Sequence, residues 1–149
     1  MKKILFIIAI LVLVLSLLIV IKVNNHVKEE QKYIPETYIE KKQKKLEYFQ
    51  SSYEYTIYEY NKEIKQDVLL ETGYNKITKE VIANINELLT IVKEKYTSNE
   101  ILNWIDSIAL ELDNENLYYI NNANDNELNF KIYIYNPREK KIHYLKITE

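Results

Sequence analysis

The sequence has no cysteine, one glycine and two prolines among its 149 residues. Without cysteine the chain forms no disulfides, no thiolate metal site and no thiol nucleophile. With one glycine it cannot build the glycine-rich loops that hold dinucleotides or phosphates, because those loops need several residues that lack a side chain. Hydroxyls, carboxylates and two histidines remain as the groups most able to carry chemistry.

Sequence motifs of catalysis are also missing. No Gly-x-Ser-x-Gly segment is present to expose a nucleophilic serine on a sharp turn. Carboxylates are numerous, but any polar helix surface brings some of them into pairs, so they do not indicate the acid/base chemistry of a glycosidase. We therefore expect a protein that is not an enzyme and that uses no cofactor.

The balance of charge argues against a nucleic-acid partner. Three of the 20 basic residues, Lys2, Lys3 and Lys22, flank a long apolar run, which leaves 17 basic side chains against 22 acidic ones. Binding to phosphates needs a basic surface. The sequence therefore predicts that this mildly acidic chain binds no nucleic acid.

The apolar run covers residues 4–21, which begin with Ile4, end with Ile21 and contain Ser16 as their one polar member. A helix of this length is about 27 Å long, close to the thickness of a bilayer's hydrocarbon core. We expect a transmembrane helix here, with residues 1–23 as a membrane anchor and the lipid bilayer as its partner. A cleaved signal peptide is the alternative, but its apolar core is shorter and ends at small residues.

The orientation of this anchor depends on the charges at its two ends. Lys2 and Lys3 precede it, while Lys22, Lys28 and Lys32 follow it, so lysine counts alone nearly tie. Long following domains are translocated largely regardless of their charge. We expect the N-terminus in the cytoplasm and the rest of the chain outside, as in a single-pass signal-anchor protein.

The polar residues 24–34 indicate a juxtamembrane connector, and the proline at position 35 marks the start of a domain over 35–149. Residues 35–73 predict one long helix that ends at Gly73, because apolar residues recur there every three or four positions: Leu46, Phe49, Tyr53, Ile57, Tyr60, Ile64 and Val68. The stretch 53–57 also alternates like a strand. We prefer the helix because its apolar stripe runs through this stretch without a break.

Residues 76–113 predict two shorter amphipathic helices, again from apolar spacings of three and four. The period then changes to two, with apolar residues at 128, 130, 132 and 134, a turn at 136–139 and a partner strand at 141–147. We expect a small antiparallel β-sheet over 117–147 that ends in a hairpin. The fold class is therefore α+β.

A run of lysines is a candidate interaction surface, formed by Lys41, Lys42, Lys44 and Lys45. On the outer side of a membrane it could meet anionic polymers of the envelope, and on the inner side anionic lipid headgroups. Nearby glutamates favour the simpler interpretation of a solvated helix face.

Neither the histidines nor the acidic loops predict a metal site. His26 and His143 are far apart in sequence and have no cysteine or third histidine to complete a zinc site. His143 shares a strand face with Leu145 and Ile147, which is typical of a packed histidine. The oxygen-rich stretches 113–116 and 121–127 could hold calcium, but Asn and Asp are also ordinary turn formers.

A membrane-anchored protein without evident chemistry suggests two roles. The first is an interaction protein of the cell envelope, which binds another membrane or envelope protein. The second is a ligand-binding or sensor domain, which would need a concave pocket. The 14 tyrosines could contribute to either surface, although a genome rich in A and T also favours this residue.

Overall fold

The computed structural model describes residues 12, 14–22, 32–35, 37–47, 51–122 and 129–148. The chain divides into two units, Met1–Pro35 and Glu36–Glu149. In the first unit residues 14–22 are helical and their side chains are exposed. The predicted span from Ile4 to Ile21 belongs to this unit, and residues 4–11 and 13 of it lie outside the described residues. Among the described residues no helix combines the length and apolar character that crossing a membrane requires.

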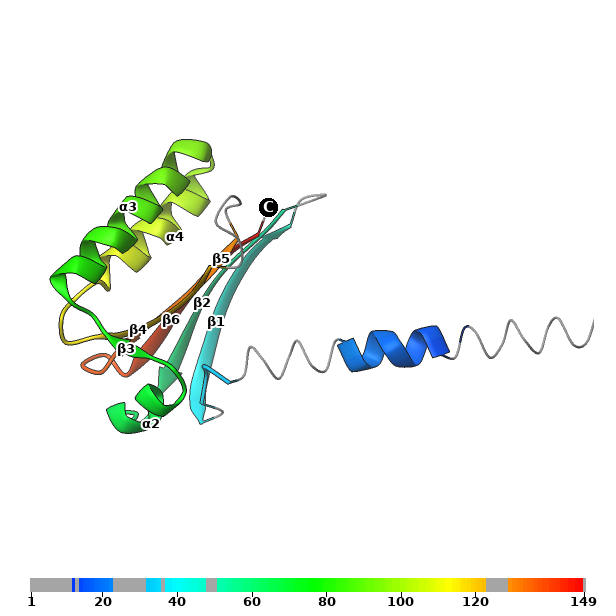
Figure 1. Ribbon diagram of the computed structural model, residues 1–149, viewed down its shortest axis with the longest axis horizontal. Coiled ribbons are helices and arrows are strands. Elements are labelled where there is room, and N and C mark those ends of the chain that lie inside the picture. Colours follow the sequence, from blue (N-terminus) through cyan, green and yellow to red (C-terminus); the bar gives the residue numbers. More distant parts are fainter. Residues whose placement is uncertain are drawn as a thin grey trace, which may run out of the picture. The chain divides into compact units, whose positions relative to one another are not determined.

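The second unit is an α+β domain (Figure 1). In chain order its described elements are β1 (Tyr38–Glu47), β2 (Ser52–Tyr60), α2 (Gln66–Glu71), β3 (Asn75–Lys76), α3 (Lys79–Lys95), α4 (Asn99–Leu110), β4 (Leu117–Asn122), β5 (Phe130–Asn136) and β6 (Lys141–Thr148). Helices α3 and α4 lie side by side on one face of the sheet (Figure 1).

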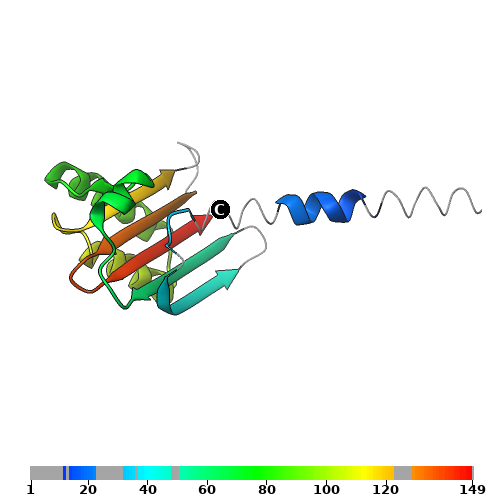
Figure 2. The ribbon, with the colours of Figure 1, turned by 90° about the horizontal axis from the view of Figure 1, so that it is seen from below.

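The strands form a six-stranded antiparallel sheet among the described residues, in the order β1-β2-β6-β5-β4-β3. The last strand, β6, lies between the N-terminal hairpin of β1 and β2 and the C-terminal pair of β4 and β5 (Figure 2). Strand β1 forms one edge of this sheet.

The prediction of one long helix over 35–73 is wrong, because β1 and β2 form an antiparallel pair of strands in the first two thirds of that range. Strand β2 is buried on both faces: Tyr53 and Tyr55 pack against the helices, while Thr56 and Tyr58 are buried on the other side. A strand with two buried faces does not alternate cleanly between apolar and polar residues. Its apolar positions therefore fell by chance at helical spacings.

The prediction of Gly73 as a helix terminus is confirmed for a shorter helix. Helix α2 ends at Glu71, Thr72 caps it, and Gly73 follows with a φ of 105°. Glycine suits this position because a Cβ atom would clash with the backbone at positive φ. The backbone N–H of Gly73 donates to the carbonyl of Leu70 at 3.1 Å, which closes the last turn.

The two helices and the C-terminal hairpin predicted after Gly73 are confirmed. Helices α3 and α4 lie within 76–113, and β5 and β6 form the expected hairpin. The Thr78 hydroxyl accepts a hydrogen bond from the backbone N–H of Val81 and so caps the start of α3. The sheet is larger than the one predicted over 117–147, because β1, β2 and β3 also belong to it.

The main core fills the space between the two helices and the sheet. It consists of the inward stripe of each helix and the facing side chains of the central strands, led by Leu89, Val92, Ile101, Trp104, Ile105, Ile108, Phe130, Ile132, Ile134, Leu145 and Ile147. Since the sheet residues alternate with those of the opposite face, this core fixes the register of β5 and β6.

The opposite face of the sheet is rich in tyrosine. Tyr119, Tyr133 and Tyr144 stand opposite one another on β4, β5 and β6, with ring centroids 5.9 and 4.6 Å apart. Tyr74 contacts Tyr119 at 6.4 Å, so the connection after β2 lies against this face. The backbone N–H of Ile64 also donates to the Tyr135 hydroxyl at 2.7 Å. Many of the tyrosines therefore form a second, aromatic core.

Candidate functional site

His143 lies on the helix-facing side of the sheet, as its position with Leu145 and Ile147 predicted. Strand β6 pairs it with Ile57 on β2 and Ile134 on β5. The residue is 5% exposed, and no other histidine and no lysine, arginine, aspartate or glutamate is buried in the part of the domain that the structure describes. Each ring nitrogen of a buried histidine needs a hydrogen-bond partner or another ligand, such as a metal ion.

Glu111 reaches His143 from the end of α4. It is the residue that follows Leu110, and one of its carboxylate oxygens, Oε1, lies 3.5 Å from Nε2 of His143. The other oxygen accepts a hydrogen bond from the side-chain amide of Asn136 at 2.9 Å. The Glu111 backbone carbonyl accepts one from the side-chain amide of Asn116 at 2.8 Å. The Glu111 backbone and carboxylate are thus both held in place.

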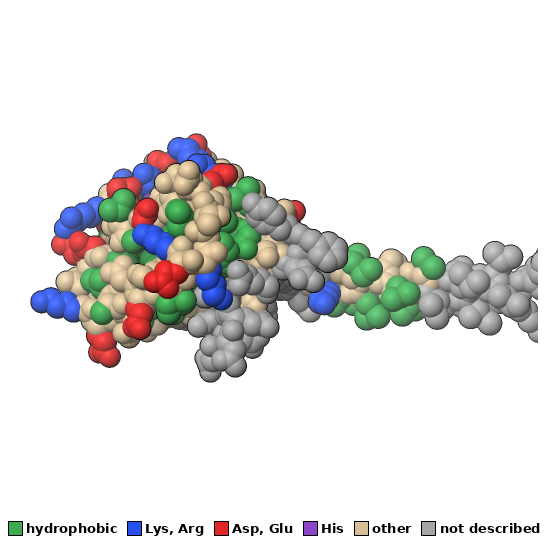
Figure 3. All heavy atoms as spheres, turned by 90° about the horizontal axis from the view of Figure 1, so that it is seen from above, with side chains coloured by type: hydrophobic (Ala, Val, Ile, Leu, Met, Phe, Trp, Pro, Cys, Tyr) green, Lys and Arg blue, Asp and Glu red, His purple; other side chains and the backbone are tan. Residues whose placement is uncertain are grey.

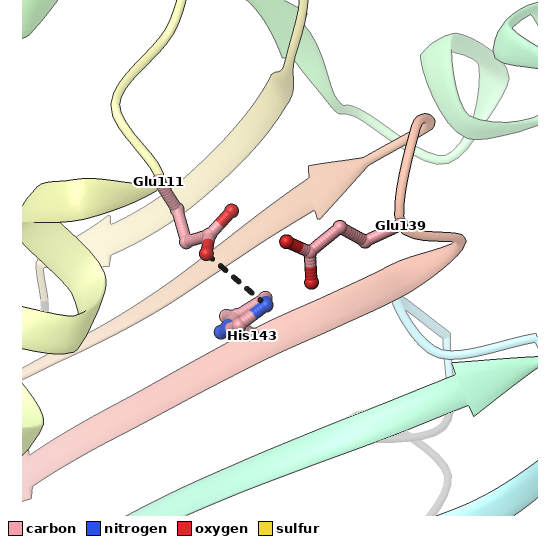
Figure 4. A group of neighbouring side chains, drawn as sticks. All are labelled: Glu111, Glu139 and His143. Carbon is pink, nitrogen blue, oxygen red and sulfur yellow. Dashed lines mark ion pairs between the residues drawn. The ribbon is translucent and has the colours of Figure 1, made fainter.

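Glu139 enters the same place from the turn between β5 and β6. Its carboxylate pairs with the ammonium group of Lys141 at 2.9 Å, and its side chain is 49% exposed. One ligand atom each from Glu111, Glu139 and His143 lie within 4.8 Å of one another. Figure 4 shows the three side chains converging from three different segments of the chain. We refer to them as the Glu–Glu–His cluster.

The other ring nitrogen of His143 is held by a tyrosine hydroxyl. Nδ1 lies 3.0 Å from the hydroxyl oxygen of Tyr55 on β2. Tyr55 also stacks on Trp104, with ring centroids 6.3 Å apart. Helix α4 therefore positions the imidazole from both sides.

Electrostatics of the cluster depend mainly on burial. Burial lowers the pKa of His143, although the carboxylates of Glu111 and Glu139 act in the opposite direction. The hydrogen bond and charge of Lys141 lower the pKa of Glu139. At neutral pH the cluster therefore presents a neutral imidazole and a carboxylate from Glu139. Oxygen and imidazole donors of this kind are ligands for divalent first-row metals.

The sequence did not reveal this cluster because its members are far apart in the chain. Glu111 stands 32 positions before His143 and joins it only because α4 ends over β6. Glu139 and His143 are four positions apart, but they lie on a turn and a strand, where that spacing has no special meaning. The one available signal was His143 itself, a titratable residue at an apolar strand position.

The four lysines of the candidate interaction surface lie on β1, not on a helix. Lys42 and Lys44 share the helix-facing side with Leu46, and Lys41 and Lys45 lie on the opposite side. Two glutamates of the same strand pair with these lysines: Glu40 with Lys42 at 3.4 Å, and Glu47 with Lys45 at 2.5 Å. The sheet therefore presents lysine on both sides of its edge strand.

The oxygen-rich stretch 113–116 forms a turn, whereas Asn121 and Asn122 of the second stretch belong to β4. The Asp113 carboxylate accepts a hydrogen bond from the backbone N–H of Glu115 at 2.9 Å, as in an ordinary turn. Glu115 pairs with Arg138 at 2.5 Å. Residues 123–128 and His26 lie outside the described residues.

A cavity of about 290 Å³ opens between α2 and the turns around Asn116 and Pro137. Charged and amide side chains, including Glu63, Gln66 and Lys76, make up most of its lining. Ligand pockets are usually of this size or larger and mainly apolar. The cavity therefore gives little support to the ligand-binding alternative.

No model of a protein family matches the chain, and no curated protein or solved structure shows significant similarity to it.

Proposed function

We propose that this chain is a single-pass, membrane-anchored interaction protein of the cell envelope, without enzymatic activity, whose α+β domain lies outside the cytoplasm. The domain binds another membrane or envelope protein along the outer edge of β1. The anchor holds the domain at the bilayer, and the edge strand supplies the contact.

The anchor rests on the composition of residues 4–21 and on the exposure of their described part. From Leu17 to Ile21 every side chain is apolar and about half exposed or more. Figure 3 shows hydrophobic side chains gathered at the surface of this helix. A helix that is apolar all round needs lipid or protein around it, because water is a poor solvent for such a surface. Together with the length of the run, this favours a bilayer.

The observation that carries the binding role is the exposure of β1. It is ten residues long, and nine of its residues are exposed. Among the described residues it pairs with β2 alone, which leaves its other edge without a strand partner. A long edge strand with free N–H and C=O groups is a template for another extended segment.

Charge indicates which segment would fit. The four lysines outnumber Glu40 and Glu47, so the strand as a whole is positive within a mildly acidic chain. Lysine at an edge also discourages unselective pairing between strands. An extended acidic segment of a partner protein fits both features of β1: it adds a strand at the edge, and its carboxylates neutralise the lysines.

Crosslinking in intact membranes tests this role. A photo-reactive amino acid replaces Ile39, which is 64% exposed on β1, and the control replaces Leu110, which is 84% exposed at the end of α4. We expect one discrete crosslinked membrane or envelope protein from position 39 and none from position 110. The absence of a product at 39, or the same products at both positions, contradicts binding along β1.

Charge reversal supplies the second arm of the test. Lys42→Glu with Lys44→Glu should abolish the crosslink from position 39, because both ammonium groups would face an acidic partner. Lys62→Glu with Lys65→Glu makes the same change of charge at two exposed positions outside β1 and should leave the crosslink unchanged. If both double variants lose the crosslink equally, overall charge alone determines binding, which contradicts a specific contact at the edge of β1.

A further inference from the structure

The Tyr55 hydroxyl holds the imidazole of His143 at its other ring nitrogen. It lies 3.0 Å from Nδ1, and a tyrosine oxygen can accept the proton of an imidazole N–H. In the neutral tautomer with the proton on Nδ1, Nε2 has no proton, and its lone pair faces the carboxylates.

This lone pair is buried without a hydrogen bond. Nε2 of His143 has no hydrogen-bond partner among the described residues, and the side chain is 93% buried, because 7% of it is exposed. It lies 3.5 Å from a carboxylate oxygen of Glu111 and points toward Glu139 as well (Figure 4). Two electron-rich atoms at this distance repel one another unless a cation lies between them.

The cation is either a second proton on the imidazole or a metal ion. A protonated Nε2 would be expected to form a direct hydrogen bond at about 2.7–2.9 Å, which is shorter than the observed 3.5 Å. The geometry favours a larger ion.

We propose that Glu111, Glu139 and His143 bind one divalent metal ion, and that zinc is the ion that fits them best. Zinc binds imidazole nitrogen and carboxylate oxygen at about 2.0–2.2 Å, which places two tetrahedral ligands about 3.4 Å apart. The observed separation of Nε2 and Oε1 is 3.5 Å. Three protein ligands leave a fourth position, which the half-exposed side of Glu139 keeps open to solvent.

The residues around the cluster do what the outer shell of a metal site does. The Tyr55 hydroxyl holds Nδ1 of His143, Asn136 orients Glu111, and Lys141 orients Glu139. Glu111 also follows the last turn of α4, where the negative end of the helix dipole favours a cation. The metal would tie the end of α4 to the β5–β6 hairpin.

Zinc titration of the full-length chain in detergent micelles, after treatment with a chelator, tests the site directly. We expect one zinc ion per chain, and a higher thermal unfolding midpoint with zinc than without it. Cobalt in place of zinc should give the intense visible absorption of a four-coordinate site. An octahedral cobalt spectrum, or no binding of zinc, overturns the proposal.

Two matched pairs of variants locate the ion. The chain has two histidines, so His143→Gln should lose zinc binding while His26→Gln keeps it. Glu139→Gln should weaken binding about tenfold or more, and Glu87→Gln on the exposed face of α3 should not. Glu139 is half exposed, so its variant stays folded even if His143→Gln does not. Unchanged zinc affinity in Glu139→Gln contradicts the site.

Discussion

At the residue scale, one tyrosine hydroxyl decides what His143 can do. The Tyr55 hydroxyl lies 3.0 Å from Nδ1 of His143, a side chain that is 88 positions away in sequence. When this oxygen accepts the proton of Nδ1, the lone pair of Nε2 faces Glu111 and Glu139. The hydroxyl is therefore a positioning group for the Glu–Glu–His cluster.

Tyr55→Phe tests this positioning role. It should lower the free energy of unfolding in the presence of a chelator by about 1–3 kcal/mol, because Nδ1 of His143 loses its buried partner. It should also weaken zinc binding about 10–100-fold, as loss of an outer-shell partner does. Urea unfolding and zinc titration measure the two effects. Tyr118→Phe, at a half-buried position beside the same core, is the control for zinc affinity; equal affinities in Tyr55→Phe and the parent chain would contradict the role.

At the element scale, the regularity of the apolar pattern decided which predictions succeeded. Helices α3 and α4 bury one side against the core, so their apolar residues recur with the helical period. Strand β5 is buried on both faces, but Phe130, Ile132 and Ile134 alternate strictly with lysine and tyrosine, which gives it the period of a strand. Strand β2 is buried on both faces by the helices and by the aromatic core. Its pattern could not be separated from a helix without knowing that a second layer covers it.

The Glu–Glu–His cluster, too, was only partly predictable from the sequence. The position of His143 on an apolar strand face was predictable, since alternation alone gives it. Its neighbours were not, because the meeting of Glu111 and Glu139 depends on where α4 ends over the sheet and on how the β5–β6 turn bends. Such long-range contacts leave no local pattern in a single sequence.

The inward face of α4 can be tested with two aliphatic residues on the same helix. Ile105 is fully buried, whereas Leu110 is 84% exposed. Ile105→Ala should lower the free energy of unfolding by about 2–5 kcal/mol, because it leaves a cavity between α4 and the sheet. Leu110→Ala should change it by less than about 0.5 kcal/mol. Urea denaturation gives both values, and similar losses at the two positions would contradict the packing described for α4.

At the scale of the whole molecule, the second face of the sheet makes stability depend on pH in the alkaline range. Tyr60 and Tyr74 are 4% and 2% exposed, and burial raises the pKa of both hydroxyls above the ordinary 10.0. The folded chain therefore keeps protons that the unfolded chain loses above that pH. This contribution to stability is complete below pH 10.0 and falls as the pH rises beyond it.

We expect these two hydroxyls to ionise together with unfolding. Phenolate absorbance and circular dichroism, followed as the pH rises, should change in one cooperative step above about pH 10. Replacing Tyr60 and Tyr74 by phenylalanine should move that step to higher pH. If all tyrosines ionise while the dichroism is unchanged, and the double variant behaves like the parent chain, the aromatic core is not packed as described.

The molecule as a whole combines an exposed apolar helix with a domain whose edge strand is positive and lacks a second strand partner in the described part of the chain. The proposed function joins these two features: the helix is fixed in a bilayer, and the domain meets its partner outside the cytoplasm. The lysine counts at the two ends of the apolar run are nearly equal. The orientation of the chain in the membrane is therefore the part of the proposal to test first.

Protease treatment of intact cells that carry the chain with a tag after Glu149 tests this step most directly. We expect the protease to remove the tag without any disruption of the membrane, while a cytoplasmic control protein remains intact. A tag that survives in intact cells and is lost only after the membrane is opened would contradict a domain held outside the cytoplasm.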